Sequence, residues 1–162
     1  MVGDYRMFNI RKASIEDLEI LIRLNTELFE HDYAFDDTLD IAWPDSEWGR
    51  DYFKKRINNS DSLTLISEDE GNIVGYMIAH LTETPDHMRK DLKLAEVENT
   101  FIVVAHRRKG LGEEMYTLVE KWAKINDANL VTITASYKNN FGRNFYTKMG
   151  LTETDVTFQK KI

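Results

Sequence analysis

The sequence predicts a mixed α/β fold, because strand patterns and helix patterns alternate along the chain. Val97–Val104 is the clearest strand, since β-branched and aromatic residues recur there and no residue breaks the pattern. Leu111–Asn126 follows as a helix, with apolar residues three and four positions apart. Two further strands, Leu63–Ser67 and Ile73–Leu81, flank Asp69-Glu70-Gly71-Asn72, whose composition is typical of a hairpin turn.

Three elements are expected before this hairpin. Tyr5–Lys12 predicts a first strand, and Ser14–Leu28 predicts a helix that starts with an N-cap signal. A second helix begins at Ser46 or Asp45, either of which can cap it, and runs to about Ile57.

The C-terminal part continues the alternation of strands and helices. Thr82–Asp91 is expected to be a loop that leads into the central strand, and Leu130–Ala135 to be a short buried strand. Asn139–Met149 predicts a helix that stops at Gly150, a favourable residue just after a helix. Leu151–Ile162 predicts one or two closing strands.

Length and composition indicate a single domain over residues 1–162. The chain has no cysteine, which excludes a disulfide framework, a thiolate metal site and a cysteine nucleophile. No apolar run approaches the ~20 residues that span a bilayer, and the first residues lack the apolar segment of a signal peptide. We therefore expect a soluble, cytoplasmic protein without a membrane partner.

The net charge of −7 is unevenly distributed. Residues 1–100 carry a net charge of −11, whereas residues 101–162 carry +4. Within the first part, Glu27–Asp51 is acidic and irregular, with aromatic residues interleaved and Arg50 as its single Lys or Arg. An acidic chain does not favour nucleic acid as a partner. A basic half for a phosphate-bearing cofactor and an acidic half for a cationic substrate fit this division.

Histidines give no indication of a metal site. The four histidines lie far apart in the sequence and lack the spacing of metal ligands. They are His31, His80, His87 and His106. We therefore expect no metal.

A basic, glycine-containing loop joins the central strand to the next helix. Its residues are Arg107, Arg108, Lys109, Gly110, Leu111 and Gly112. Backbone N–H groups in the first turn of a helix are unpaired and bind anions, and glycines permit close approach. The loop lacks the Walker pattern and the G-x-G-x-x-G pattern, which excludes those two nucleotide sites. By itself, the loop is equally compatible with an ordinary strand-to-helix turn.

Two motifs in order resemble the GNAT superfamily of N-acetyltransferases. The first is Arg107-x-x-Gly110-x-Gly112, which is similar to the acetyl-CoA pyrophosphate loop of that superfamily. The second is Asn139-x-x-Gly142-x-x-Phe145-Tyr146-x-x-Met149-Gly150-Leu151. It departs from the superfamily pattern at Gly142, where a small alanine is usual. The resemblance is specific over residues 92–151 and general before them.

The resemblance implies a fold and a cofactor site. The fold is a central, mostly antiparallel sheet with helices on both faces, in which the central strand splays from the strand at Leu130–Ala135. Acetyl-CoA is the implied co-substrate, with its pyrophosphate held by the basic loop. Asn139 is implied to bind the pantetheine arm, although a helix N-cap has the same sequence signal. The implied backbone contacts to that arm come from Phe101, Ile102 and Val103.

Three side chains are candidates for the chemistry of acetyl transfer to an amine. An alkyl ammonium has a pKa of about 10.4, so a base must remove its proton before attack. Glu96 and Glu98 are both candidates, and they face one side of a regular strand. Glu98 lies closer to the loop and is slightly preferred, but a bulge in this strand would alter which glutamate faces the cofactor. Tyr146 matches the superfamily tyrosine that protonates the leaving thiolate.

The sequence thus predicts direct transfer of acetyl from acetyl-CoA to a primary amine in a ternary complex. The acceptor is expected to be a small cationic amine or a peptide amine, drawn by Glu27–Asp51, with Tyr33, Phe35 and Trp43 available for cation–π contacts. A homodimer is compatible with the resemblance. The alternative is a CoA-binding sensor or scaffold without turnover, a role that needs neither glutamate nor Tyr146.

Overall fold

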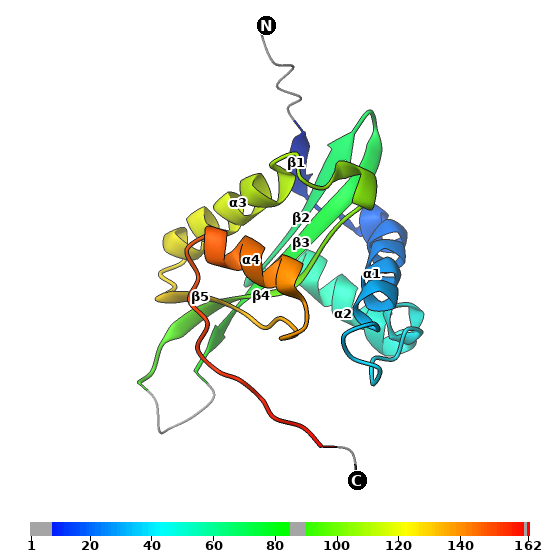
Figure 1. The fold of residues 1–162 in the computed structure, drawn as a ribbon. Helices are drawn as coiled ribbons and strands as arrows, with labels where there is room; N and C mark the ends of the chain where they lie inside the picture. The colour runs from blue at the N-terminus through cyan, green and yellow to red at the C-terminus, as the bar shows by residue number, and fades with distance from the viewer. Residues whose placement is uncertain (1–7, 85–89, 161) are drawn as a thin grey trace, which may run out of the picture.

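A five-stranded sheet runs through the centre of the protein, here a computed structural model that describes residues 8–84, 90–160 and 162 (Figure 1). The strands lie in chain order: β1 (Asn9–Lys12), β2 (Ser62–Asp69), β3 (Asn72–Glu83), β4 (Lys93–Ile102) and β5 (Leu130–Ile133). The pairs β1–β2, β2–β3 and β3–β4 are antiparallel, whereas β5 is parallel to β4. The predicted mostly antiparallel sheet is therefore confirmed.

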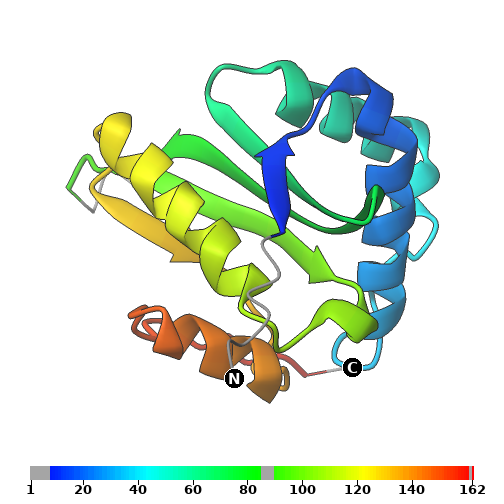
Figure 2. The same ribbon diagram turned by 90° about the horizontal axis from the view of Figure 1, so that it is seen from above.

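Helices cover both faces of the sheet, as predicted (Figure 2). The elements are α1 (Leu18–Asp32) and α2 (Glu47–Asn58) on one face, and α3 (Leu111–Ile125) and α4 (Asn140–Lys148) on the other. Three short 3₁₀ helices join them: η1 (Ile15–Asp17), η2 (Trp43–Asp45) and η3 (Val104–His106).

Two hydrophobic cores lie on opposite faces of the sheet. The core under α1 and α2 includes Leu21, Leu24, Phe53, Ile66, Tyr76, Ile78 and Phe101. The core under α3 includes Leu63, Leu65, Met77, Val97, Leu111, Met115 and Val119. Phe145, Met149 and Leu151 pack against the second core, which attaches α4 to the same side as α3.

Several expected boundaries change in the structure. The first helix continues to Asp32, so Glu27 and Glu30 lie on α1 and not in an irregular segment. Of the expected first strand, Asn9–Lys12 forms β1, and residues 1–7 lie outside the described part. In the expected loop between β3 and β4, residues 85–89 also lie outside it.

The expected closing strands at Leu151–Ile162 are wrong for the residues that the structure describes. Residues 151–160 form no strand, and Phe158 is 92% exposed. A strand needs a paired backbone edge as well as a suitable pattern. Here residues 151–160 pair with no strand, and Glu153 forms an ion pair with Arg143 of α4.

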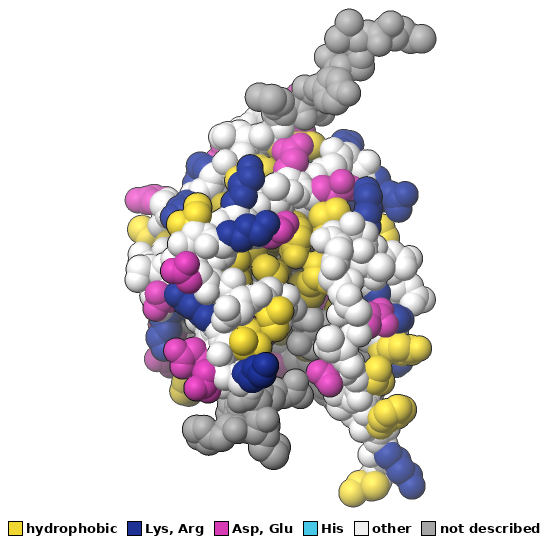
Figure 3. Space-filling model, turned by 90° about the vertical axis from the view of Figure 1, so that its left-hand side faces the viewer, with side chains coloured by type: hydrophobic (Ala, Val, Ile, Leu, Met, Phe, Trp, Pro, Cys, Tyr) yellow, Lys and Arg dark blue, Asp and Glu magenta, His cyan; other side chains and the backbone are white. Residues whose placement is uncertain are grey.

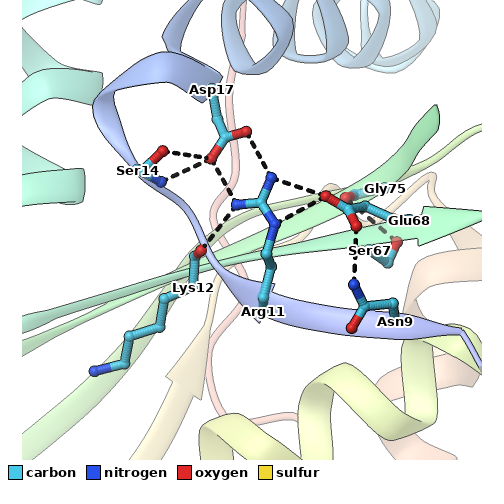
Figure 4. Close-up of polar contacts among 8 residues, drawn as sticks. All are labelled: Asn9, Arg11, Lys12, Ser14, Asp17, Ser67, Glu68 and Gly75. Carbon is cyan, nitrogen blue, oxygen red and sulfur yellow. Dashed lines mark hydrogen bonds and ion pairs between the residues drawn. The ribbon is translucent and has the colours of Figure 1, made fainter. Parts of the chain in front are cut away.

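An ion-pair cluster fixes the chain between β1 and α1 (Figure 4). Asp17 is buried and accepts hydrogen bonds from both terminal nitrogens of Arg11, at 2.8 and 3.0 Å. The Ser14 amide also donates to Asp17, at 2.7 Å, and closes the turn before the helix. Arg11 bonds in addition to Glu68 on β2, so one guanidinium connects the first strand, the second strand and the start of α1. The Arg11 hydrogen bonds hold the pKa of Asp17 below its usual value, against the opposing effect of burial.

This pair predicts a pH-dependent contribution to stability. Because the folded-state pKa of Asp17 is lowered, its contribution is complete above the unfolded-state value of about 3.9 and is lost as pH falls through the folded-state value. Asp17→Asn should lower the free energy of unfolding at neutral pH by about 1–2 kcal/mol, measured by urea denaturation. The loss should shrink in acid, whereas the exposed control Glu83→Gln should change little at either pH. An equal loss for Asp17→Asn at both pH values would contradict the assignment.

Candidate active site

The sheet opens between β4 and β5. Residues Leu94–Val97 of β4 pair with Leu130–Ile133 of β5, and β4 then continues to Ile102 without a further β5 partner. The edge of β4 after Val97 is therefore unpaired on this side, as the resemblance implied. Figure 3 shows the side of the molecule on which β5 lies, where hydrophobic side chains line a hollow near the centre and Lys and Arg side chains lie at its borders.

The open edge exposes a limited set of backbone groups. The Val103 amide donates to Val74 of β3 at 2.9 Å, so it is directed away from the opening. Because successive residues of a strand point to opposite sides, Phe101 is also directed towards β3, while Thr100 and Ile102 face the opening. The Ile102 carbonyl already accepts a hydrogen bond from Nε of Arg107, at 2.8 Å. Of the three predicted backbone contacts, only Ile102 faces the opening, and its amide has no acceptor within residues 8–84, 90–160 and 162.

The basic loop leads from this edge into α3. Leu111 is buried in the core, so only its backbone faces outward. The backbone amides from Lys109 to Glu113 donate to no acceptor among the described residues, as expected for a helix N-terminus. Arg108 and Lys109 are exposed and form no ion pair with any described residue. The loop therefore carries five backbone amides without acceptors among the described residues, next to the two exposed cationic side chains of Arg108 and Lys109.

Arg107 differs from its two neighbours. Its guanidinium folds back onto β4, donates to the Ile102 carbonyl and lies over the Phe101 ring at 5.4 Å. This side chain therefore attaches the loop to the strand. The pyrophosphate contact expected of it would come from its backbone or from Arg108 and Lys109.

The two loop glycines are required for different reasons. Gly110 has φ +86°, in the left-handed region, and a Cβ there would meet nothing within 4 Å. Gly112 packs against the Phe145 ring, which a Cβ would approach to 3.3 Å. Gly110 thus shapes the loop, while Gly112 lets α4 lie close to α3.

Asn139 caps α4. Its Oδ1 accepts a hydrogen bond from the Gly142 amide at 2.9 Å, so the capping alternative describes this side chain. A Cβ at position 142 would come within 3.0 Å of Asn139 Nδ2. Glycine in place of the usual alanine therefore leaves more room for the Asn139 side chain, whose amide nitrogen has no acceptor among the described residues.

Tyr146 lies on α4 beside the open part of β4. Burial raises the pKa of its phenol to about 12, and the neighbouring Thr100 hydroxyl acts in the opposite direction. Thr100 Oγ1 is buried and completes no hydrogen bond within the described residues. Tyr146 is therefore protonated at neutral pH and lies near one of the two residues whose backbone faces the opening.

Glu98 is already bound by α2. A register shift in β3–β4 pairing leaves it without a cross-strand partner, which identifies the expected bulge. Its carboxylate accepts hydrogen bonds from Arg56 Nε at 2.6 Å, from a terminal nitrogen of Arg56 at 2.7 Å and from the Tyr52 hydroxyl at 2.8 Å. Burial, with the Glu98 charge, raises the pKa of Tyr52, so this phenol remains a donor. Both Glu98 oxygens are occupied.

The bulge also directs Asn99 towards α1 and α2. Asn99 donates to the Tyr52 hydroxyl at 2.8 Å and accepts from Asn25 at 3.2 Å. Asn25 is fully buried and donates to the Tyr76 hydroxyl at 2.7 Å. A continuous polar chain thus joins α1, β3, β4 and α2 through the core.

Glu96 lies one pleat before Glu98 on β4. It is half-buried, and its carboxylate forms no hydrogen bond or ion pair with any described residue. Of the two glutamates, Glu96 is therefore the one with available oxygens. The two carboxylates thus differ in their contacts, and the identity of the base stays a prediction.

Sequence reasoning did not identify Tyr52, Arg56 or His80 as neighbours of the site. The spacing of Tyr52 and Arg56 places them on one face of α2, a signal that was present in the sequence. Nothing in the sequence indicates that this face meets Glu98, because that contact depends on the bulge. Across the described residues, no group of histidine, cysteine and carboxylate side chains is arranged to hold a metal ion.

The comparisons with known proteins agree with this geometry. The acetyltransferase (GNAT) family matches residues 26–151, so the chain belongs to this family, whose co-substrate is acetyl-CoA. An uncharacterized N-acetyltransferase of Bacillus subtilis (strain 168), YhfO, is 27% identical over 103 residues, which cover 63% of this chain and 66% of that protein. The match thus spans slightly less than two thirds of that relative.

Two solved structures are similar in fold. A mutant of the BH1408 protein from Bacillus halodurans has a TM-score of 0.83 at 19% identity, covering 95% of this chain and 99% of that one. The aminoglycoside N-acetyltransferase AAC(6')-Iy in complex with CoA has a TM-score of 0.78 at 17% identity, covering 99% of each chain. Within the described part of this chain, no helix is both long and apolar enough to cross a membrane.

The loop geometry predicts separate effects of two matched glycine substitutions. Gly110→Val should weaken CoA binding at least about tenfold in calorimetry, because the left-handed backbone no longer presents the loop amides. Gly71 has φ +80° and equally open surroundings, but lies in the β2–β3 turn. Gly71→Val should lower the melting temperature to a similar extent and leave CoA affinity unchanged. Normal CoA binding by Gly110→Val would show that the loop is not the pyrophosphate site.

Proposed function

We propose that this protein transfers the acetyl group of acetyl-CoA to a primary amine, by direct attack in a ternary complex. The observation that supports this most strongly is the unpaired edge of β4, which runs into the loop of free amides and has Tyr146 beside it. An extended pantetheine arm can pair with such an edge, while the loop amides and cations bind the pyrophosphate.

The first chemical requirement is a base for the acceptor. Glu96 is the proposed base, because its carboxylate binds no side chain among the described residues, whereas both oxygens of Glu98 are bound to α2. The amine attacks the thioester carbon, and a backbone amide at the open edge stabilises the oxyanion. The supporting geometry is the Ile102 amide, which faces the opening.

The second requirement is a proton for the leaving thiolate. Tyr146 is protonated at neutral pH and lies beside the open edge, so its phenol can donate to sulfur. The amide nitrogen loses a proton as the product forms, and this proton restores the phenol. Because the chain has no cysteine, direct transfer needs no acyl-cysteine intermediate.

A small cationic amine or a peptide amine remains the proposed acceptor class. A surface groove of about 380 Å³ between α1 and the start of α2 is lined by four carboxylates and two guanidinium groups. They belong to Glu19, Glu27, Glu30, Asp45, Arg23 and Arg50. Trp43 stacks on Phe29 at 5.7 Å and also contacts Tyr52, so it is not available for the cation–π role suggested above.

The alternative is a CoA-binding sensor or scaffold that does not turn over. A pure binding module needs no protonated tyrosine at the thioester position and no unoccupied carboxylate on the neighbouring strand. A homodimer and a cytoplasmic location stay predictions from the sequence.

Thiol release from acetyl-CoA, measured against a panel of cationic, neutral and anionic amines, tests the proposed function. A cationic amine should give the highest kcat/KM, and this value should fall as salt is raised. Replacing Glu27 and Glu30 with glutamine should flatten the salt dependence. The same charge removal at Glu114 and Glu120 on α3 serves as the control. Absence of thiol release with every amine would favour the sensor, and a salt-independent kcat/KM would reject the cationic acceptor.

Tyr146→Phe tests the proton donor. The ring stays while the hydroxyl is lost, so kcat should fall on the order of 10²-fold with CoA affinity near that of the wild type. Tyr137 is exposed and precedes α4, so Tyr137→Phe is a matched control with expected wild-type rates. An unchanged kcat for Tyr146→Phe would remove this residue from the mechanism.

Glutamine substitutions separate the two glutamates. Glu96→Gln should lower kcat most near neutral pH and recover as rising pH deprotonates the amine, with little change in melting temperature. Glu98→Gln should lower the stability by about 1–3 kcal/mol, because Arg56 loses its carboxylate partner. Recovery at high pH for Glu98→Gln alone would identify Glu98 as the base.

A further inference from the structure

Four polar side chains form a row across the sheet beside the proposed base. The register pairs β2 with β3, β3 with β4 and β4 with β5 at one level of the sheet. The residues of this row are Ser62, His80, Glu96 and Thr132. The row faces α2, because Thr64, two residues from Ser62 on β2, donates to the Arg56 carbonyl of that helix. His80 and Glu96 are direct cross-strand neighbours.

His80 extends from the interior towards the surface. Its Nδ1 is buried, lies 3.3 Å from Glu98 Oε1 and completes no hydrogen bond within the described residues. The side chain as a whole is 17% exposed, so part of it reaches solvent. An imidazole that lies next to the carboxylates of β4 and also reaches water can pass a proton from a carboxylate to solvent.

Charged side chains from β4 and α2 surround His80. The ionised groups that face it are Glu96 and Glu98 from β4 and Arg56 from α2, while Tyr52 is a neutral phenol and Ser62 a hydroxyl. Two carboxylates against one guanidinium leave a net charge of −1. A proton on the imidazole would bring the net charge of this cluster to zero.

We propose that His80 takes the acceptor's proton from Glu96 and releases it to solvent. The inference rests on the proposed function. An ammonium acceptor loses one proton to the Glu96 carboxylate before attack and a second as the amide forms. The second proton restores Tyr146 after the thiolate is protonated, so one proton remains on Glu96 in each turnover. It passes to the His80 ring and then to water, which returns Glu96 to its ionised state.

Glu98 cannot perform this step. Its oxygens accept three hydrogen bonds from Arg56 and Tyr52, and protonation would break the ion pair with α2. The imidazole of His80, the cross-strand neighbour of Glu96, can exchange a proton without breaking the Arg56–Glu98 ion pair. Its role is therefore relay of a proton, and Glu98 fixes the helix against which this relay is built.

The test is the pH profile of kcat for His80→Gln, measured by thiol release from about pH 6 to about pH 9, where imidazole titrates. Glutamine preserves a polar side chain but cannot titrate. We expect kcat to fall about tenfold near neutral pH, the histidine limb of the profile to disappear and CoA affinity to stay unchanged. His106 contacts Asp69 by the hairpin, so His106→Gln removes a different imidazole and should leave this limb in place.

Chemical rescue provides an independent measurement. Added imidazole should restore kcat of His80→Ala several-fold, while it should not affect the wild type. A wild-type pH profile in His80→Gln overturns the relay. A pH-independent loss of kcat in His80→Gln, together with no rescue of His80→Ala by imidazole, also overturns the relay. That pattern indicates that His80 contributes only to packing. If the wild-type protein itself releases no thiol with any amine, the proposed function fails and the relay fails with it.

Discussion

Glu98 has no partner across the β3–β4 ladder, since pairing passes directly from Ile78 and Asn99 to Ala79 and Val97. A regular strand would alternate these side chains between the two faces, but the extra residue turns Glu98 and Asn99 to the same face. That face receives α1 and α2. The bulge therefore supplies the polar groups that bind both helices to the central strand.

The resulting network is largely buried, so the loss of a hydrogen-bond partner within it is costly. Glu98 is neutralised by a bidentate contact with Arg56, and the Tyr52 hydroxyl both donates to Glu98 and accepts from Asn99. Such a network adds little net stability compared with apolar packing, yet loss of one member leaves a buried group unpaired. Its main effect is orientation: it sets where α2 lies relative to β4. This placement leaves Glu96 available and brings the Glu98 carboxylate to His80.

The edge of β4 that faces β5 is open because β5 is short. Since β5 ends at Ile133, the backbone of Thr100 and Ile102 faces an opening instead of a strand. Arg107 occupies the Ile102 carbonyl and holds the basic loop against the strand end. Phe145 lies against Gly112, which brings α4, and with it Tyr146, to the same opening. Packing thus brings the open edge of β4, the loop amides and the Tyr146 phenol together after the bulge. The carboxylates of Glu96 and Glu98 belong to the part of β4 before Asn99.

The sequence by itself determined the order of strands and helices, because hydrophobic periodicity and the residues that start or end an element are local properties of each segment. The two motifs are also visible in the sequence. They identified the basic loop, Asn139 and Tyr146 as candidate site residues. The sequence could not predict that Leu151–Ile162 would leave the sheet, since strand formation depends on a partner edge as well as on a pattern. Nor could it decide between Glu96 and Glu98, whose chemical types and alternation are identical. The tertiary structure gives the two carboxylates different surroundings, because a bulge changes which side chains share a face, and only folding places Arg56 and Tyr52 around one of them.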